Sequence, residues 1–103
     1  MKIPKKVIIA GKEFTVEKDF KGRGGSYSSD KAHIYIGTKN HTKDEIDNTF
    51  LHEVIEAILS ERMLRFKLPY IGDSNGDYLF NFNHLEFENW VRDLRLALKD
   101  CLK

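Results

Sequence analysis

The segment His52-Glu53-Val54-Ile55-Glu56 holds the residues of this sequence that are best suited to chemistry. In a helix, side chains four residues apart lie one turn above each other on the same face. His52 and Glu56 can therefore bind one metal ion through an imidazole nitrogen and a carboxylate oxygen, both of which are common zinc ligands. Glu53 would lie beside that ion and could take a proton from a metal-bound water. The spacing predicts a metal site with Glu53 as its catalytic base.

A catalytic zinc site typically has three protein ligands and leaves one position for water. The third ligand should come from an element that packs against this segment, which makes His84 the first candidate and Glu88 the alternative. Zinc is the expected ion, and the carboxylate of Glu56 also admits manganese or iron. That carboxylate lowers the net charge of the site, so a bound metal would be a weaker Lewis acid and its water less acidic.

A simpler interpretation assigns these residues no metal. His52 and Glu56 would then be a hydrogen-bonded pair one helical turn apart at the margin of the core. His84 would be a surface residue at the start of another helix. Both interpretations place the two residues of the pair on one face of a helix.

A capping box predicts where the helix that carries the segment begins. Thr42 and Glu45 have the required spacing for reciprocal hydrogen bonds, and Asp44 adds a favourable charge at the positive end of the helix dipole. The helix is expected to span residues 43–65 and to end before Pro69.

Apolar residues occupy most of the circumference of this helix, which predicts that it is the core helix of the fold. His52 and Glu56 share an arc with Leu59 and Met63. We therefore expect both members of the pair to project into a covered cleft, where a carboxylate needs a cation or a hydrogen-bond donor.

Two further elements follow the core helix. Tyr70-Ile71 and residues 78–82 flank Asn75-Gly76, a pattern typical of a β-hairpin over residues 70–82. A last helix is expected over residues 84–102, with its apolar face on the core helix and with Asp93 outside that face.

The N-terminal part of the chain is rich in β-forming residues. Residues 7–10 and 14–17 predict a hairpin, with Phe14 and Val16 of its second strand pointing inward. Residues 21–30 are rich in glycine and serine and are expected to form a loop, and residues 32–37 alternate like a third strand. Together the elements predict one α+β domain over residues 1–103, in which a small antiparallel sheet covers the two helices.

The composition limits the possible partners. The 103 residues include 17 basic and 16 acidic residues, which leave a formal charge of +1 and no electrostatic argument for nucleic acid or an anionic membrane. Cys101 is the single cysteine, so an internal disulfide is excluded. With no apolar N-terminal run, the chain is expected to be a soluble cytoplasmic protein.

The pattern of elements and motifs resembles the minimal zincin-like metallopeptidases of phages and mobile elements, which are distantly similar to the peptidases that cleave phage repressors. The resemblance covers the hairpin, the third strand, residues 50–58 and the helix that begins at His84. In that family the first and fifth motif positions are ligands and the glutamate after the first histidine is the base. The resemblance therefore implies His52 and Glu56 as ligands and Glu53 as the base. Glu56 replaces the second histidine of H-E-x-x-H, and the chain resembles small phage relatives that carry H-E-x-x-E with a later histidine. Gluzincins take their third ligand from a glutamate, and this resemblance favours Glu88 over His84.

The resemblance implies a small zincin-like metal-dependent hydrolase, a peptidase of phage or prophage type acting in the host cytoplasm on a protein or peptide. Its substrate is expected to lie along the strand at residues 32–37 by β-addition. The alternative is a non-enzymatic phage accessory protein that binds another protein on a degenerate zincin scaffold. His52 and Glu56 would then be a structural metal site or no metal site.

Overall fold

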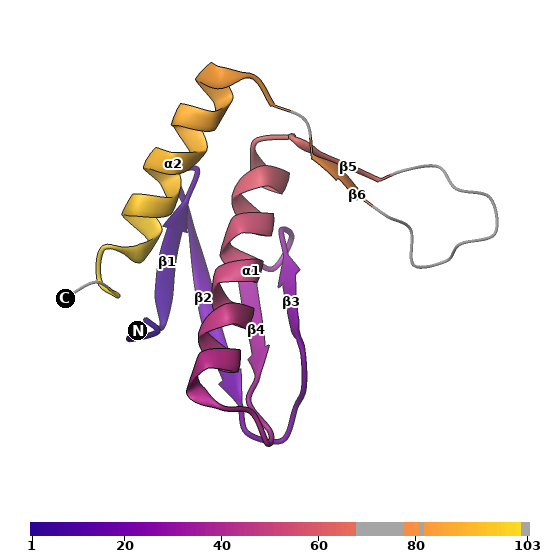
Figure 1. Ribbon diagram of the computed structural model, residues 1–103, viewed down its shortest axis with the longest axis vertical. Coiled ribbons are helices and arrows are strands. Elements are labelled where there is room, and N and C mark those ends of the chain that lie inside the picture. The colour runs from indigo at the N-terminus through magenta and orange to yellow at the C-terminus, as the bar shows by residue number, and fades with distance from the viewer. Residues whose placement is uncertain (68–77, 81, 102–103) are drawn as a thin grey trace.

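The computed structural model describes residues 1–67, 78–80 and 82–101 (Figure 1). A four-stranded sheet and two helices account for most of these residues, and two short strands form a separate ribbon. The predicted α+β class is confirmed. In chain order the elements are β1 (Lys6–Ile9), β2 (Lys12–Asp19), β3 (Gly25–Ser28), β4 (His33–Gly37), α1 (Lys43–Glu61), β5 (Arg65–Lys67), β6 (Tyr78–Phe80) and α2 (His84–Leu98).

The predicted N-terminal hairpin is formed by β1 and β2. The two strands pair antiparallel, with Val7 opposite Phe14. Ala10 and Gly11 connect them with positive φ angles of 51° and 79°, the left-handed backbone that a tight hairpin turn requires. Phe14 and Val16 are buried, as their alternation predicted.

The sheet is mixed, so the prediction of a purely antiparallel sheet was wrong. The strand order is β1-β2-β4-β3, and β4 runs parallel to β2 and antiparallel to β3. Strand β3 lies within the segment 21–30 that was expected to be a loop. Its sequence, Gly-Ser-Tyr-Ser, contains one large apolar residue and therefore carries no alternating pattern. As a result β4 is hydrogen-bonded on both sides, and β3 and β1 are the two edge strands of the described sheet.

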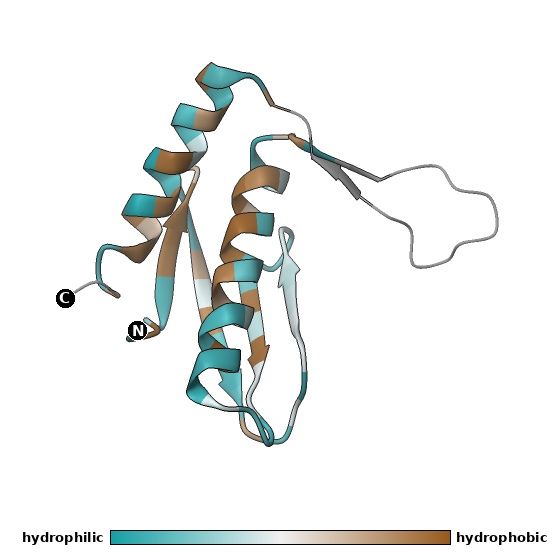
Figure 2. Ribbon diagram, in the orientation of Figure 1, coloured by the Kyte–Doolittle hydropathy of each residue, from teal (hydrophilic) through white to brown (hydrophobic). Residues whose placement is uncertain are grey.

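Both helices cover the same face of the sheet (Figure 1). Helix α1 packs on β3 and β4, and α2 packs on β1 and against α1. The N-terminal part of α1 is mostly hydrophilic and the remainder is mostly hydrophobic (Figure 2). Within the described part of the chain, neither helix combines the length and apolar composition needed to cross a membrane. The core between the sheet and the helices consists of Val7, Ile9, Phe14, Val16, Ile34, Ile36, Phe50, Val54, Ala57, Ile58, Ala97, Leu98 and Cys101.

Helix α1 begins as predicted and ends earlier than predicted. The capping box is present: the Glu45 amide donates to the Thr42 hydroxyl, and the Thr42 amide donates to the Glu45 carboxylate. At the other end, Met63 has a φ of 60°. The amides of Met63 and Leu64 donate to the carbonyls of Ser60 and Leu59, which is the hydrogen-bond pattern of a Schellman cap.

This early end changes the pairing of the second hairpin. Arg65, the predicted last residue of the helix, instead begins β5, which pairs antiparallel with β6. Strand β6 lies within the predicted strand at 78–82, whereas the predicted strand Tyr70-Ile71 and its turn Asn75-Gly76 lie outside the described residues.

Helix α2 begins at the predicted cap, where the Asn83 side chain accepts from the Glu86 amide, and ends at Leu98. Residue 102, the predicted end, is outside the described residues. The prediction that Asp93 lies outside the apolar face was wrong, because Asp93 is buried and only 6% exposed. The Arg62 guanidinium donates two hydrogen bonds to the Asp93 carboxylate, one from Nη2 at 3.0 Å. This pair compensates the buried charge and joins the end of α1 to the middle of α2.

The cap at Met63 generates a stability prediction. A left-handed backbone costs a residue with a Cβ atom about 1 kcal/mol relative to glycine. The side chain of Met63 is 79% exposed and contributes little packing. The substitution Met63→Gly should therefore raise the free energy of unfolding by about 1 kcal/mol in urea denaturation.

Met63→Ala is the matched control, because it removes the side chain and keeps the Cβ atom. Its free energy of unfolding should stay within about 0.5 kcal/mol of the wild type. If glycine and alanine have equal effects, strain at this cap does not limit the stability of the protein.

Candidate metal centre

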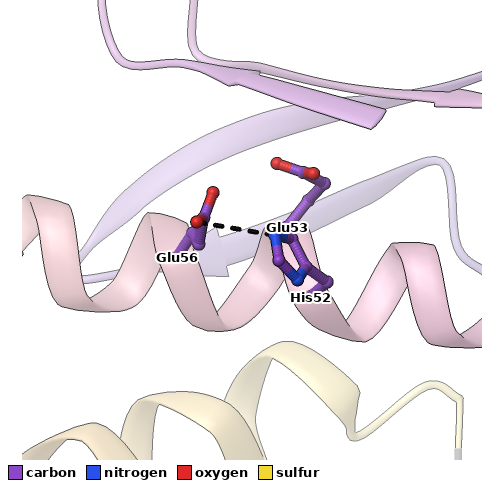
Figure 3. A group of neighbouring side chains, drawn as sticks. All are labelled: His52, Glu53 and Glu56. Atoms are coloured by element: carbon purple, nitrogen blue, oxygen red, sulfur yellow. Dashed lines mark ion pairs between the residues drawn. The ribbon is translucent and has the colours of Figure 1, made fainter. Parts of the chain in front are cut away.

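His52, Glu53 and Glu56 form a compact group on α1 (Figure 3). One ligand atom from each of the three side chains lies within 4.8 Å of the other two. Nε2 of His52 is 3.5 Å from Oε1 of Glu56, as expected for residues one helical turn apart. No other set of three or more His, Cys, Asp or Glu side chains in the described part of the chain has this arrangement. The group is the best candidate for a metal site.

The three side chains differ in their exposure. The side chain of His52 is 63% exposed and that of Glu56 is 25% exposed, whereas the residue Glu53 is only 5% exposed. The prediction that the pair projects into a covered cleft was therefore wrong for His52. Glu53 follows Phe50 by three residues and precedes Ala57 by four, so it shares the face of α1 that packs on the sheet. His52 is rotated from this face toward solvent.

Strand β3 covers Glu53. A Cβ atom on Gly25 would lie 2.9 Å from Oε2 of Glu53 and 2.7 Å from Cγ2 of Thr49. Only glycine allows the backbone of the edge strand to approach α1 this closely. The sequence predicts a loop at Gly25, because this contact depends on tertiary packing and has no local signal.

The surroundings of Glu53 make it more basic than an ordinary glutamate. Burial raises the pKa of its carboxyl group, and the negative charge of Glu56 raises it further. His52 and Arg65 lower this pKa by a smaller amount. A carboxylate with a raised pKa accepts a proton from water more readily, which suits a general base.

Glu56 interacts with two basic side chains. Its Oε1 atom faces His52, and its Oε2 atom is 3.7 Å from Nη1 of Arg65. Arg65 comes from β5, the strand that follows α1, and its guanidinium also lies over the ring of Tyr27. Glu56 is thus oriented from both sides, with one oxygen directed toward the candidate ligand His52.

His84 and Glu88, the predicted sources of a third ligand, lie outside this group. Their side chains are 83% and 58% exposed, and Nδ1 of His84 is 3.7 Å from Oε1 of Glu88. They lie on the first turns of α2, which begins at the end of the molecule where α1 finishes, whereas His52 lies near the middle of α1 (Figure 1). The identity of a third ligand stays a prediction.

A second polar cluster holds β3 in place beside the candidate centre. Glu61, in the last turn of α1, accepts hydrogen bonds from the hydroxyl groups of Tyr27 at 2.8 Å and Ser29 at 2.7 Å. Nζ of Lys12 lies 3.6 Å from the same carboxylate oxygen. These contacts bring strands β2 and β3 to the end of α1. No local pattern in the chain predicts these contacts, because the residues are far apart in sequence.

Comparison with known proteins identifies no relative from which a function could be transferred. No family model, curated protein or solved structure matches this chain. The chemistry of the site therefore has to be argued from its own residues.

The Glu61 cluster predicts a dependence of stability on pH. Burial acts to raise the pKa of Glu61, but the hydrogen bonds from Ser29 and Tyr27 and the charge of Lys12 outweigh it, so the pKa is lowered from its ordinary 4.5. A group whose pKa is lower in the folded state stabilises the fold above its unfolded pKa. This contribution should be lost as the pH falls from about 4.5 through the lower folded value.

The substitution Glu61→Gln should therefore lower the free energy of unfolding at pH 7 by about 1–2 kcal/mol, because the group that accepts the two hydrogen bonds loses its charge. Between pH 5 and 3, roughly the range in which a carboxylate titrates, the variant should lose less stability than the wild type in urea denaturation. Glu13→Gln is the control, because Glu13 is paired only with the exposed Lys6 on the hairpin. Equal pH profiles for Glu61→Gln and the wild type would contradict the assignment.

Proposed function

We propose that the protein is a small zincin-like metal-dependent hydrolase that acts on peptides. The observation that supports this most strongly is the juxtaposition of His52 and Glu56, which are suited to hold a metal ion, with the buried and basic Glu53. The position of this group beside a free sheet edge adds a route for a peptide substrate.

Each of the three residues has a distinct role in the proposed reaction. His52 and Glu56 would hold the ion, which supplies a Lewis acid that lowers the pKa of bound water. Glu53 takes the proton from the attacking water at a carboxylate oxygen and returns it to the amine that leaves when the peptide bond breaks. Burial of Glu53 favours its neutral form, so it can carry the proton between the two steps.

The substrate would lie along β3. The prediction that it adds to the strand at residues 32–37 was wrong, because β4 already pairs with β2 and β3. An extended peptide can add only to an edge with unpaired backbone groups, and of the two edge strands of the described sheet, β1 and β3, it is β3 that lies beside the candidate centre. Gly25 of β3 lies against Glu53, so a peptide at this edge passes close to the candidate base.

A non-enzymatic protein-binding role is the second candidate. It is favoured by the ion pairs of Glu56 with His52 and Arg65, which compensate its charge without a metal. In that case the group would be a structural feature of α1, and the free edge of β3 would serve for association alone.

Metal binding separates the two candidates. Protein purified without a histidine tag should bind one equivalent of zinc, as measured by metal analysis and by calorimetric titration. His52→Ala and Glu56→Ala should each weaken binding by about 100-fold or more, beyond the 10–100-fold loss typical of outer-shell substitutions. His33→Ala is the control, because His33 pairs with Glu17 on the opposite face of the sheet.

His84→Ala and Glu88→Ala in the same titration test the third ligand. A 100-fold loss in one of them would assign that residue, and it would require a movement of α2 toward His52. If the wild type binds no zinc and His52→Ala leaves it unchanged, the protein is not a metal-dependent hydrolase.

Glu53→Gln tests catalysis independently of binding. The amide has the shape of the carboxylate but cannot accept the proton of water, so hydrolysis of a casein or peptide-library substrate should fall by about 10²–10⁴-fold. Zinc affinity should stay within about tenfold of the wild type, because glutamine leaves both proposed ligands in place. Retained cleavage in this variant would remove Glu53 from the role of base.

A further inference from the structure

An apolar groove adjoins the candidate metal centre on the side of α1 that faces α2. In Figures 1 and 3, α1 lies between the edge strand and α2, so the centre has a neighbour on each side. Toward β3, the hollow beside His52 and Glu53 is lined by Gly25, Asn48 and Thr49. Toward α2, a groove of about 320 Å³ is lined by His52, Ile55, Glu56, Leu59, Phe82 and Trp90. His52 therefore separates a polar hollow from an apolar one.

The walls of this groove favour a large apolar guest. Apart from His52 and Glu56, all lining residues are aliphatic or aromatic. Phe82 and Trp90 pack edge to face with ring centroids 6.3 Å apart, and Phe87 supports Trp90 at 5.3 Å. Phe82 is still 39% exposed, so its ring offers apolar surface to a guest. A groove of this kind gains free energy by removing apolar surface from water.

Trp90 also carries an unused hydrogen-bond donor. Its indole nitrogen Nε1 is buried and has no acceptor within the described parts of the chain. A buried donor without a partner is unfavourable, and buried tryptophans usually find one. Because Nε1 is shielded from solvent, the indole of Trp90 presents its apolar surface, and not its N–H group, to a guest in the groove.

We propose that this groove is the specificity pocket of the centre and takes a leucine or phenylalanine side chain of a peptide, next to the bond that is cleaved. The proposal rests on the proposed function, since His52 and Glu56 both line the groove and belong to the candidate metal group. A side chain in the groove therefore places its own backbone beside the candidate ligands.

Trp90 is the single tryptophan of the sequence, so its fluorescence reports directly on the groove. The Glu53→Gln protein loaded with zinc should be titrated with blocked pentapeptides that differ only in a central phenylalanine, leucine or serine. Phenylalanine and leucine peptides should shift the Trp90 emission with saturation and bind about tenfold or more tightly than the serine peptide, the range that an apolar pocket discriminates. Equal affinities for the three peptides would overturn the proposal.

Variants of the groove provide a second measurement. Ile55→Ala enlarges the groove and should change the phenylalanine-to-leucine ratio of kcat/KM in the active protein several-fold. Val91→Ala is the control, because Val91 is exposed on α2 and does not line the groove. If Ile55→Ala and Val91→Ala give the same ratio as the wild type, the groove does not select the substrate.

The outcomes distinguish this inference from the proposed function. Zinc-dependent cleavage that has no preference for apolar residues would overturn the specificity pocket and leave the hydrolase intact. If the protein binds apolar peptides in the groove but binds no zinc, the hydrolase is overturned and the groove remains a peptide site. A shift of Trp90 emission with protein concentration alone, accompanied by a dimer mass, would show that a second copy of the chain fills the groove and would overturn the proposal.

Discussion

The packing of Phe50, Val54 and Ala57 against the sheet determines the rotation of α1, and through it the direction of every side chain in the candidate centre. These three residues are fully buried, so a rotation of the helix would expose apolar surface and bury polar groups. Glu53 lies on the same face, so this packing places it against β3. His52 and Glu56 lie on the adjacent arc, at the boundary between the core and solvent. Helix α1 thus provides both the packing against the sheet and the side chains of the candidate centre.

The edge strand β3 depends on a small number of specific contacts. Its sequence offers little apolar surface, and it is held by backbone pairing with β4, by the close approach of Gly25 to α1, and by the hydrogen bonds from Tyr27 and Ser29 to Glu61. Polar contacts of this kind specify a position more strictly than apolar contacts, because they are directional. The strand is therefore positioned beside Glu53, with its outer edge unpaired in the sheet formed by the described residues.

Charge balance at the centre depends on both His52 and Arg65. The group contains two carboxylates on adjacent turns, and their mutual repulsion is reflected in the raised pKa of Glu53. Arg65 offsets part of this repulsion from the strand that follows the Schellman cap. The early end of α1 is what brings Arg65 to this position. The pairing between Arg62 and Asp93 then fixes α2 beside the same end of α1, which leaves the apolar groove between the two helices.

The sequence by itself determined the features that depend on neighbouring residues. The capping box at Thr42, the inward positions of Phe14 and Val16, the α+β class and the helical pairing of His52 with Glu56 all follow from local spacing, and the structure confirms them.

Only the tertiary structure decided the features that depend on contacts between distant segments. Residues 25–28 form a strand, and α1 ends at Met63 in a left-handed conformation. Asp93 is buried beside Arg62, and Glu53 rather than His52 is buried. None of these has a periodic signal. The strand and the buried carboxylates depend on partners in other elements, whereas the cap at Met63 is a local turn that lacks its usual glycine. His84 shows the same limit, since its helix was predicted correctly but its direction relative to His52 was not readable from the chain.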